Sequence, residues 1–366
     1  MKSTPSTKPH LRIGFIELID CAPLLTAQEL GFFEKEGIRV ELSREVGWAT
    51  IRQKVLYHQI DAAHAVAGLA MSLRLGLDGI ECPAIAPFVF NLHGHAITLS
   101  LDLWRRGVRD AATLKKLIRS SRQRLYTLGI VARSASHNFL LRQWLRSGGI
   151  DPDRDVRLVV LPPTQMAGAL KEGLIDGFSA GEPWNSSAVV AGAGWCPVTS
   201  AELAPHHPEK ILLTTEPFAE QQPEILSAVI RALGEACAWC DVPENRPALV
   251  KLLTKTPHFH MEAEVLKRSL IGPFQDGTGQ SRDARDFYIF HRDHANEPTR
   301  DRGEWLVDQF CASGLVPADQ RPHVYRTMLS SWRGDLYHQA LAHERPTSQP
   351  RPRRAAKVTS TAPASA

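Results

Sequence analysis

The sequence lacks any apolar run near the roughly 20 residues that a membrane-spanning helix needs. Its first ten residues, MKSTPSTKPH, are polar and lead directly into the strand-like LRIGFIELI. That apolar run is too short for the core of a signal peptide, and no small-residue cleavage site follows it. These absences predict a cytoplasmic protein that does not insert into a membrane.

Cysteine is scarce and scattered, with six residues in 366. Without a secretory signal, this usage predicts free thiols rather than a disulfide framework. Cys237 and Cys240 form a C-x-x-C pair, but the pair ends a segment with helical spacing, whereas a redox pair normally opens a helix. No second pair is present to complete a zinc site. We interpret both cysteines as packing residues.

Charge of one sign is not in large excess, because the formal net charge is only +4. Such a value does not indicate direct nucleic-acid binding. The segment 345–366 is rich in Pro, Ser, Thr, Ala and Arg and has almost no large apolar residues. This composition predicts a disordered basic tail, which we interpret as solvated rather than as a contact for RNA or an acidic partner.

Catalytic motifs are also missing. The sequence has no G-x-S-x-G, no P-loop and no G-x-G-x-x-G that opens a helix after a strand. The best metal candidates are two histidine pairs, His258 with His260 and His291 with His294, and neither has a clear third ligand in the sequence. We therefore expect no enzymatic activity, no cofactor and no metal.

What the sequence does contain is a regular alternation of strand-like and helix-like segments. The alternation runs from residue 11 to 100, restarts near 110 and ends with a return strand, KILLTTEPF. Only helical segments follow, at 222–241, 244–254, 261–270, 301–313 and 319–330. This order predicts two α/β units with helix-covered parallel sheets, followed by a helical C-terminal region.

Three of the predicted helices begin directly after strands with polar or amphipathic residues, namely Trp48, His137 and Glu182. Free backbone N–H groups and the positive end of the helix dipole lie at such starts. In an open α/β sheet they gather at the carboxyl ends of the strands, where a small anion can bind. The same residues can simply cap their helices, so this pattern leaves both interpretations open.

Several longer motifs carry a family resemblance. They are LRIGFIELIDCAPLLTAQELGFFEKEGIRVELSREVGWATIRQKV, IDAAH, NLHGHAITLS, SGGIDPDRDVRLVVLPPTQM, IDGFSAGEPWN and HHPEKILLTT, in this order. Over residues 10–330 the chain resembles the nitrate- and bicarbonate-binding proteins of ABC importers. It also resembles their cytoplasmic relative, the nitrate/nitrite sensor that pairs with an RNA-binding antiterminator.

The resemblance implies a type II periplasmic-binding-protein fold without enzymatic activity. Such a fold has two α/β lobes, a ligand cleft between them and, here, a helical C-terminal region. We expect residues 10–98 plus 215–335 to form lobe 1, residues 99–214 to form lobe 2, and residues 345–366 to form the tail.

The resemblance also implies which residues hold the oxyanion. Carried over, they are Trp48, His95, His137, Gly181, Glu182 and Lys210. His95 departs from the amide that is usual at its position, although a neutral imidazole N–H can still donate one hydrogen bond. Lys210 is expected to supply the positive charge. Ionised Glu182 cannot bind nitrate directly, so we expect it to orient Lys210 or a histidine.

These expectations lead to one main hypothesis, a cytoplasmic nitrate/nitrite sensor that controls a regulatory antiterminator partner in nitrate assimilation. The alternative is the solute-binding component of an ABC transporter for nitrate, bicarbonate or a related anion. A third class, an enzyme of thiamine-pyrimidine synthesis with a related fold, is disfavoured because the sequence has no cysteine-rich active-site run.

Overall fold

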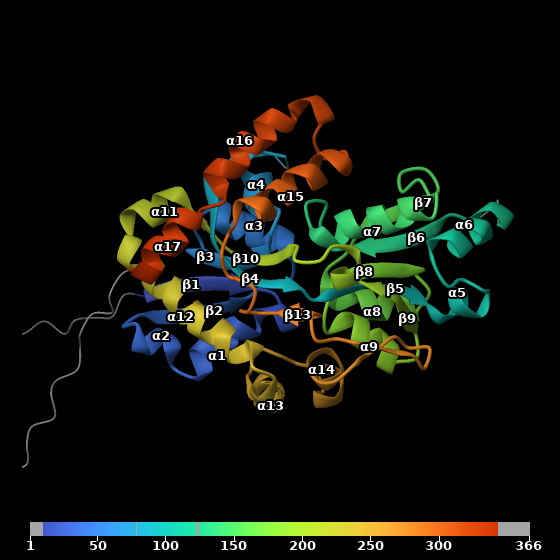
Figure 1. Ribbon diagram of the computed structural model, residues 1–366, viewed down its shortest axis with the longest axis horizontal. Helices are drawn as coiled ribbons and strands as arrows, with labels where there is room; N and C mark the ends of the chain where they lie inside the picture. The colour runs from blue at the N-terminus through green and yellow to red at the C-terminus, as the bar shows by residue number, and fades with distance from the viewer. Residues whose placement is uncertain (1–9, 78, 122–123, 343–366) are drawn as a thin grey trace, which may run out of the picture.

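Two lobes, each built on its own β-sheet, lie side by side in the computed structural model (Figure 1). The structure describes residues 10–77, 79–121 and 124–342. The expected tail, 345–366, lies outside the described residues. The predicted fold class, two α/β lobes with a helical C-terminal region, is confirmed.

The sheet of the first lobe has the strand order β13-β4-β10-β3-β1-β2. Strand β1 is parallel to β2 and β3, whereas β10 is antiparallel to β3 and β4. The returning strand β10 therefore makes this sheet mixed rather than parallel. The strands are β1 (His10–Phe15), β2 (Arg39–Arg44), β3 (Ala62–Val66), β4 (Ala84–His93), β10 (Pro208–Thr215) and β13 (Tyr288–Ile289).

The sheet of the second lobe has the order β7-β6-β8-β5-β9 and is mixed for the same kind of reason. Strand β6 is parallel to β7 and β8, and β5 is antiparallel to β8 and β9. The strands are β5 (His95–Ser100), β6 (Tyr126–Ile130), β7 (Val156–Val160), β8 (Gly177–Gly181) and β9 (Gly194–Thr199). A separate two-stranded sheet joins β11 (Phe274–Gln275) to β12 (Ser281–Arg282).

Helices cover both faces of each large sheet (Figure 1). In the first lobe they are α1 (Ala22–Glu29), α2 (Phe32–Lys35), α12 (Pro223–Asp241) and α17 (Gly334–Ala342) on one face, and α3 (Trp48–Leu56), α4 (Leu69–Arg74), α15 (Arg300–Ala312) and α16 (Arg321–Ser331) on the other. In the second lobe the main helices are α6 (Ala111–Ser120), α7 (Ser136–Ser147), α8 (Pro163–Lys171) and α9 (Trp184–Val190).

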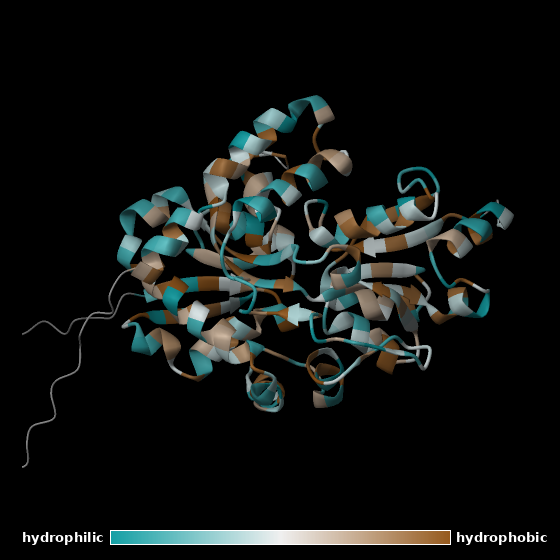
Figure 2. Cartoon of the chain, viewed as in Figure 1, coloured by the Kyte–Doolittle hydropathy of each residue, from teal (hydrophilic) through white to brown (hydrophobic). Residues whose placement is uncertain are grey.

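Shorter or peripheral helices complete the chain. They are α5 (Leu101–Arg105), α10 (Ser200–Leu203), α11 (Glu216–Gln221), α13 (Arg246–Lys255) and α14 (Ala263–Leu270). Apolar residues are concentrated on the strands and alternate with polar residues along the outer helices (Figure 2). Among the described helices, none has the length and apolar character that a membrane span requires. Cys237 and Cys240 are free and buried within α12, as expected of packing residues.

The strand pairing shows that both lobe boundaries differ from those expected. The chain passes from β4 to β5 through Gly94, so the second sheet begins at His95 instead of residue 99. Strand β10 is hydrogen-bonded in the first sheet from Pro208, whereas residues up to 214 were expected in lobe 2. Gly94 has a φ of 98°, and a Cβ there would lie 2.1 Å from the Tyr288 ring, so the crossing requires glycine.

The two lobes touch through their backbones, because Ile19 N–H of the first lobe donates to Glu182 O of the second at 2.8 Å. Glu182 N–H in turn donates to O of the connecting residue Gly94 at 3.2 Å. Gly68, just before α4, packs so closely on the loop before α7 that a Cβ would lie 2.1 Å from Ser134 O. The lobes are therefore in direct contact where several strands of both sheets end.

Candidate functional site

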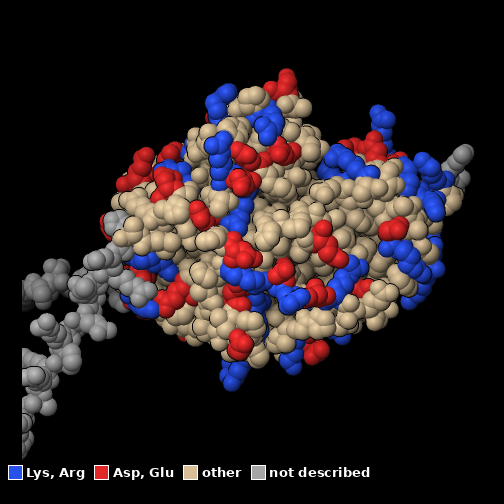
Figure 3. All heavy atoms as spheres, viewed as in Figure 1, with Lys and Arg blue, Asp and Glu red and all other residues tan. Residues whose placement is uncertain are grey.

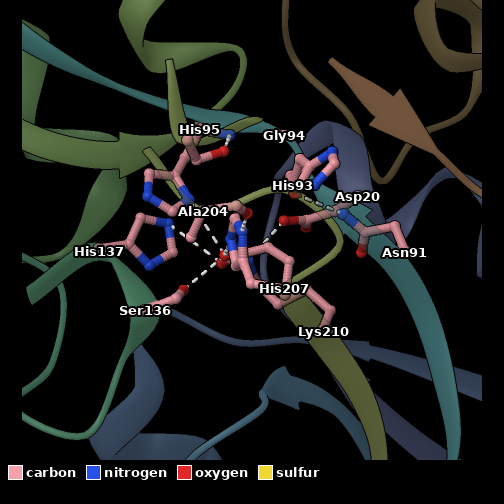
Figure 4. A network of polar contacts seen from close by, with 12 residues as sticks. Asp20, Asn91, His93, Gly94, His95, Ser136, His137, Ala204, His207 and Lys210 are labelled. Carbon is pink, nitrogen blue, oxygen red and sulfur yellow. Dashed lines mark hydrogen bonds and ion pairs between the residues drawn. The ribbon is translucent and has the colours of Figure 1, made fainter. Parts of the chain in front are cut away.

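A buried polar cluster lies at the junction of the lobes (Figure 4). Its side chains come from strands, from the segments beside them and from the starts of helices, and each is at least nine-tenths buried. The first lobe contributes Asp20, Trp48, His64, His207, Glu209 and Lys210. The second lobe contributes His95, Ser136 and His137, next to the backbone of Gly181 at the end of β8.

Lys210, on β10, is held between two carboxylates. Its Nζ lies 2.6 Å from Asp20 Oδ2 and 2.7 Å from Glu209 Oε1. Burial alone would lower the pKa of Lys210, but the attraction of both carboxylates outweighs burial and raises it. The ammonium group is therefore charged but already neutralised. This corrects the expectation that Lys210 supplies a free positive charge to a ligand.

Asp20 follows β1 and has a second partner besides Lys210. Its Oδ1 lies 3.0 Å from His64 Nε2 on β3. Burial raises the pKa of Asp20, but Lys210 and His64 outweigh burial, so the net pKa lies below its ordinary value. Asp20 is therefore an ionised carboxylate at neutral pH.

The Glu209 carboxylate contacts side chains of both lobes. Its Oε2 accepts a hydrogen bond from Ser136 and lies 3.0 Å from His95 Nδ1 and 3.2 Å from His207 Nε2. His137 Nε2 lies 3.4 Å from the other oxygen, Oε1. Although burial raises the pKa of Glu209, Lys210 and the surrounding imidazoles hold it well below its usual range.

Three imidazoles of the cluster are neutral at pH 7, because burial lowers the pKa values of His64, His95 and His137. They lie beside two ionised carboxylates, Asp20 and Glu209, and the ammonium group of Lys210. A small anion that enters this junction therefore meets neutral imidazoles and charges of both signs.

Several polar atoms in and beside the cluster are buried without a hydrogen-bond or ion-pair partner among the described residues. They are Trp48 Nε1, His64 Nδ1, His95 Nε2, His137 Nδ1 and the nearby Ser179 Oγ. Buried polar groups in proteins are usually satisfied, so such a concentration suits the binding of a small polar ligand. Trp48 Nε1 is a donor only, whereas the role of each histidine nitrogen depends on the tautomer.

The structure brings five of the six predicted residues together. The rings of His95 and His137 stack with centroids 4.3 Å apart, and Lys210 Nζ lies 5.7 Å from the Trp48 ring centre. A Cβ on Gly181 would lie 3.5 Å from Asp20 Oδ2 and 3.7 Å from His137 Nε2. Their role in ligand binding remains a prediction.

The lobes that supply these residues differ from expectation. Trp48 and His95 were expected from one lobe, and His137, Glu182 and Lys210 from the other. His95 instead opens β5 of the second sheet, and Lys210 lies in β10 of the first.

His95 also differs from the donor that was expected. Its Nδ1 faces the Glu209 carboxylate, which only accepts, so the neutral ring carries its proton on Nδ1. Its unpartnered Nε2 is then an acceptor. In this tautomer His95 cannot donate a hydrogen bond to an oxyanion through Nε2.

Glu182 takes no part in orienting the cluster. Its Oε2 accepts a hydrogen bond from the backbone N–H of Ser186, in the first turn of α9. Within the described ranges, no ion pair joins Glu182 to Lys210 or to a histidine. The expectation that Glu182 orients one of them is therefore wrong, because its carboxyl group turns into the second lobe.

Sequence reasoning missed half of the cluster. Asp20, His64, Ser136, His207 and Glu209 were not selected. Three signals were present in the sequence: Asp20 directly follows the first strand, His64 interrupts an apolar strand, and His207 and Glu209 stand beside Lys210 in HHPEK.

The buried Glu182 carboxyl group generates a prediction about pH. Burial raises its pKa to about 7, against hydrogen bonds from Ser186 and Ser269 that act in the opposite direction. Cys196 and Tyr288 are its ionisable neighbours, and their raised pKa values keep them neutral. The native state therefore holds a proton that the unfolded chain, with a pKa of 4.5, has lost.

The free energy of unfolding should accordingly fall by about 3 kcal/mol as the pH rises from about 4.5 to about 7. Glu182→Gln, which cannot ionise, should remove this part of the slope. Urea denaturation of both proteins between pH 5 and pH 8 measures it. Parallel stability curves for the two proteins would contradict the assignment.

Comparisons with known proteins agree with this architecture. Residues 4–254 match the NMT1-like family. The chain is 36% identical over 312 residues to the nitrate import ATP-binding protein NrtC of Synechocystis, which covers 84% of this chain and 47% of the relative. It is 35% identical over 316 residues to the bicarbonate transport ATP-binding protein CmpC of Synechococcus elongatus, covering 85% of this chain and 46% of the relative.

The chain thus spans about half the length of these curated relatives. Among solved structures, the periplasmic nitrate-binding protein NrtA from Synechocystis superposes with a TM-score of 0.86 at 27% sequence identity. That superposition covers 92% of this chain and 89% of NrtA. The chain belongs to the NMT1-like family, as a homologue of the NrtA nitrate-binding proteins with a periplasmic-binding-protein-like fold.

Proposed function

We propose that the protein binds a small planar oxyanion, nitrate or nitrite, at the junction of its lobes. The observation that carries this proposal is the set of buried nitrogen atoms from both lobes that have no partner among the described residues, above all Trp48 Nε1 and His137 Nδ1. Nitrate offers only acceptor oxygens, so it needs donors of this kind. Homology to the nitrate-binding protein NrtA supports the same ligand class.

Bicarbonate is the second candidate, because two carboxylates lie in the cluster. Bicarbonate carries an O–H group that can donate a hydrogen bond to the Asp20 or Glu209 carboxylate, whereas nitrate has no proton to donate. Both carboxylates are fully buried, so a ligand that donates to one of them gains a strong hydrogen bond. The similarity to CmpC, a bicarbonate transport protein, supports this candidate.

For the cellular role, we propose a cytoplasmic nitrate/nitrite sensor whose ligand state controls an RNA-binding antiterminator partner. The alternative role is a solute-binding component of an ABC transporter, in keeping with the names of the transport relatives. The face in Figure 3 shows basic and acidic side chains interspersed. A protein partner suits such a mixed surface better than a direct nucleic-acid contact does.

Calorimetric titration with nitrate, nitrite and bicarbonate tests the ligand class, and Trp48→Phe tests the site. The substitution keeps an aromatic ring but removes the indole N–H, so affinity should fall about ten- to hundred-fold. Trp195→Phe is the matched control, because Trp195 is also buried with an unpartnered Nε1 but packs in the core of the second lobe. Equal losses in both variants would show that Trp48 does not contact the ligand.

Contacts from two lobes also require the lobes to approach closely. Gly68→Ala places a methyl group against Ser134 O, so it should hold the lobes apart and weaken oxyanion binding about ten-fold or more. Gly234→Ala in α12 is the control, because a Cβ there meets no atom within 4 Å. Calorimetry measures both variants, and undiminished affinity in Gly68→Ala would show that binding does not need this contact.

The sensor role predicts that the oxyanion changes the affinity for a regulatory partner. A ligand can shift the lobes only by its differential affinity for the closed arrangement, and the partner must distinguish the same arrangements. Pull-down from the native cells with and without saturating nitrate, combined with cell fractionation, measures both partner and location. Equal capture in both conditions, or recovery from the periplasm, would contradict the sensor role.

A further inference from the structure

His207 points its Nε2 at the Glu209 carboxylate in a fully buried environment. His207 Nδ1 lies 2.7 Å from Ala204 O, and a carbonyl oxygen only accepts, so Nδ1 carries a ring proton. His207 Nε2 lies 3.2 Å from Glu209 Oε2. The imidazole nitrogen and the carboxylate oxygen can therefore share a cation, either a proton or a metal ion.

We propose that His95 Nδ1, His207 Nε2 and a Glu209 carboxylate oxygen bind a divalent transition metal of the Zn²⁺ class. The three ligand atoms all lie within 4.8 Å of one another. Zn²⁺ lies about 2.0–2.1 Å from nitrogen and oxygen ligands, so two neighbouring ligands of a tetrahedral ion are about 3.3 Å apart. The distances of 3.0 and 3.2 Å from Glu209 to His95 and His207 match this spacing.

The surroundings of these three residues are those of a metal site. A metal-binding histidine usually donates its second ring N–H to a backbone carbonyl or a carboxylate, as His207 does to Ala204. Glu209 is fixed in turn by Ser136 and Lys210. Three protein ligands leave the fourth tetrahedral position for water or a ligand. The earlier expectation of no metal considered only His258, His260, His291 and His294.

The buried carboxylates of Glu209 and Asp20 give a second reason for a cation at this place. A divalent ion adds positive charge beside the place where the oxyanion is proposed to bind. This step rests on the proposed function, whereas the metal site itself does not.

Metal binding also changes what His95 offers to the lobe junction. The metal takes the Nδ1 lone pair, so the ring proton moves to Nε2, which has no hydrogen-bond partner in the part of the chain that the structure describes. Nε2 then becomes a hydrogen-bond donor. The metal thereby supplies the donor that the metal-free tautomer of His95 lacks, and metal and oxyanion should bind cooperatively.

Zn²⁺ titration of the chelator-treated full-length protein, with no oxyanion present, tests the metal site. We expect one Zn²⁺ per chain by calorimetry. Loss of a direct ligand in His207→Ala should lower the affinity by at least about 100-fold. His338→Ala is the control, because the His338 side chain is 62% exposed and pairs with Glu297 away from the cluster. No binding to the native protein, or equal binding to His207→Ala, would overturn the site.

Co²⁺ absorption of the native protein keeps the test valid if His207→Ala does not fold. The site should give the intense visible bands of tetrahedral Co²⁺, and the weak spectrum of the hydrated ion would overturn the proposal. Nitrate titration with chelator and with Zn²⁺ then separates the two claims. Zn²⁺ binding without any nitrate binding would support the metal site and contradict the proposed function. Nitrate binding without any Zn²⁺ binding would support the proposed function and contradict the metal site.

Discussion

The buried ammonium group of Lys210 is the interaction on which the lobe junction depends. It is fully buried between Asp20 and Glu209, and each of these carboxylates has further partners. Burying three charges costs several kcal/mol per ion, and only close pairing with additional hydrogen bonds offsets that cost. Glu209 accepts such bonds from Ser136 and His95 in the second lobe, so the second lobe completes the hydrogen bonding of the charges buried in the first.

Much of the fold could be predicted from the sequence, because helix and strand periodicity and the strand-to-helix order are local signals. The helices near 48, 136 and 223 begin close to where the sequence places them. Strand pairing is not a local property. The segment KILLTT contains no local signal that β10 pairs between β3 and β4. The short strand β9 does not alternate between buried and exposed residues, so its sequence gives little indication of a strand. Both lobe boundaries were misplaced for this reason.

The candidate site was predicted in part for a similar reason. The family resemblance located Trp48, His137 and Lys210, which the structure brings together. It could not show what neutralises Lys210, because Asp20 is 190 positions away along the chain and meets it only when β1 and β10 share a sheet. The tautomers of His95 and His207 depend on carbonyl and carboxylate neighbours that only the folded chain supplies.

The backbone hydrogen bond from Ile19 to Glu182 has a consequence for the timing of ligand exchange. Because it joins one lobe to the other, its N–H can meet solvent only when the lobes separate. The rate at which this amide proton exchanges with deuterium therefore measures how often the two lobes separate. A tightly bound guest would slow that exchange in proportion to the time that the lobes stay closed. The exchange rate of the Ile19 amide therefore reports how long a ligand remains between the lobes.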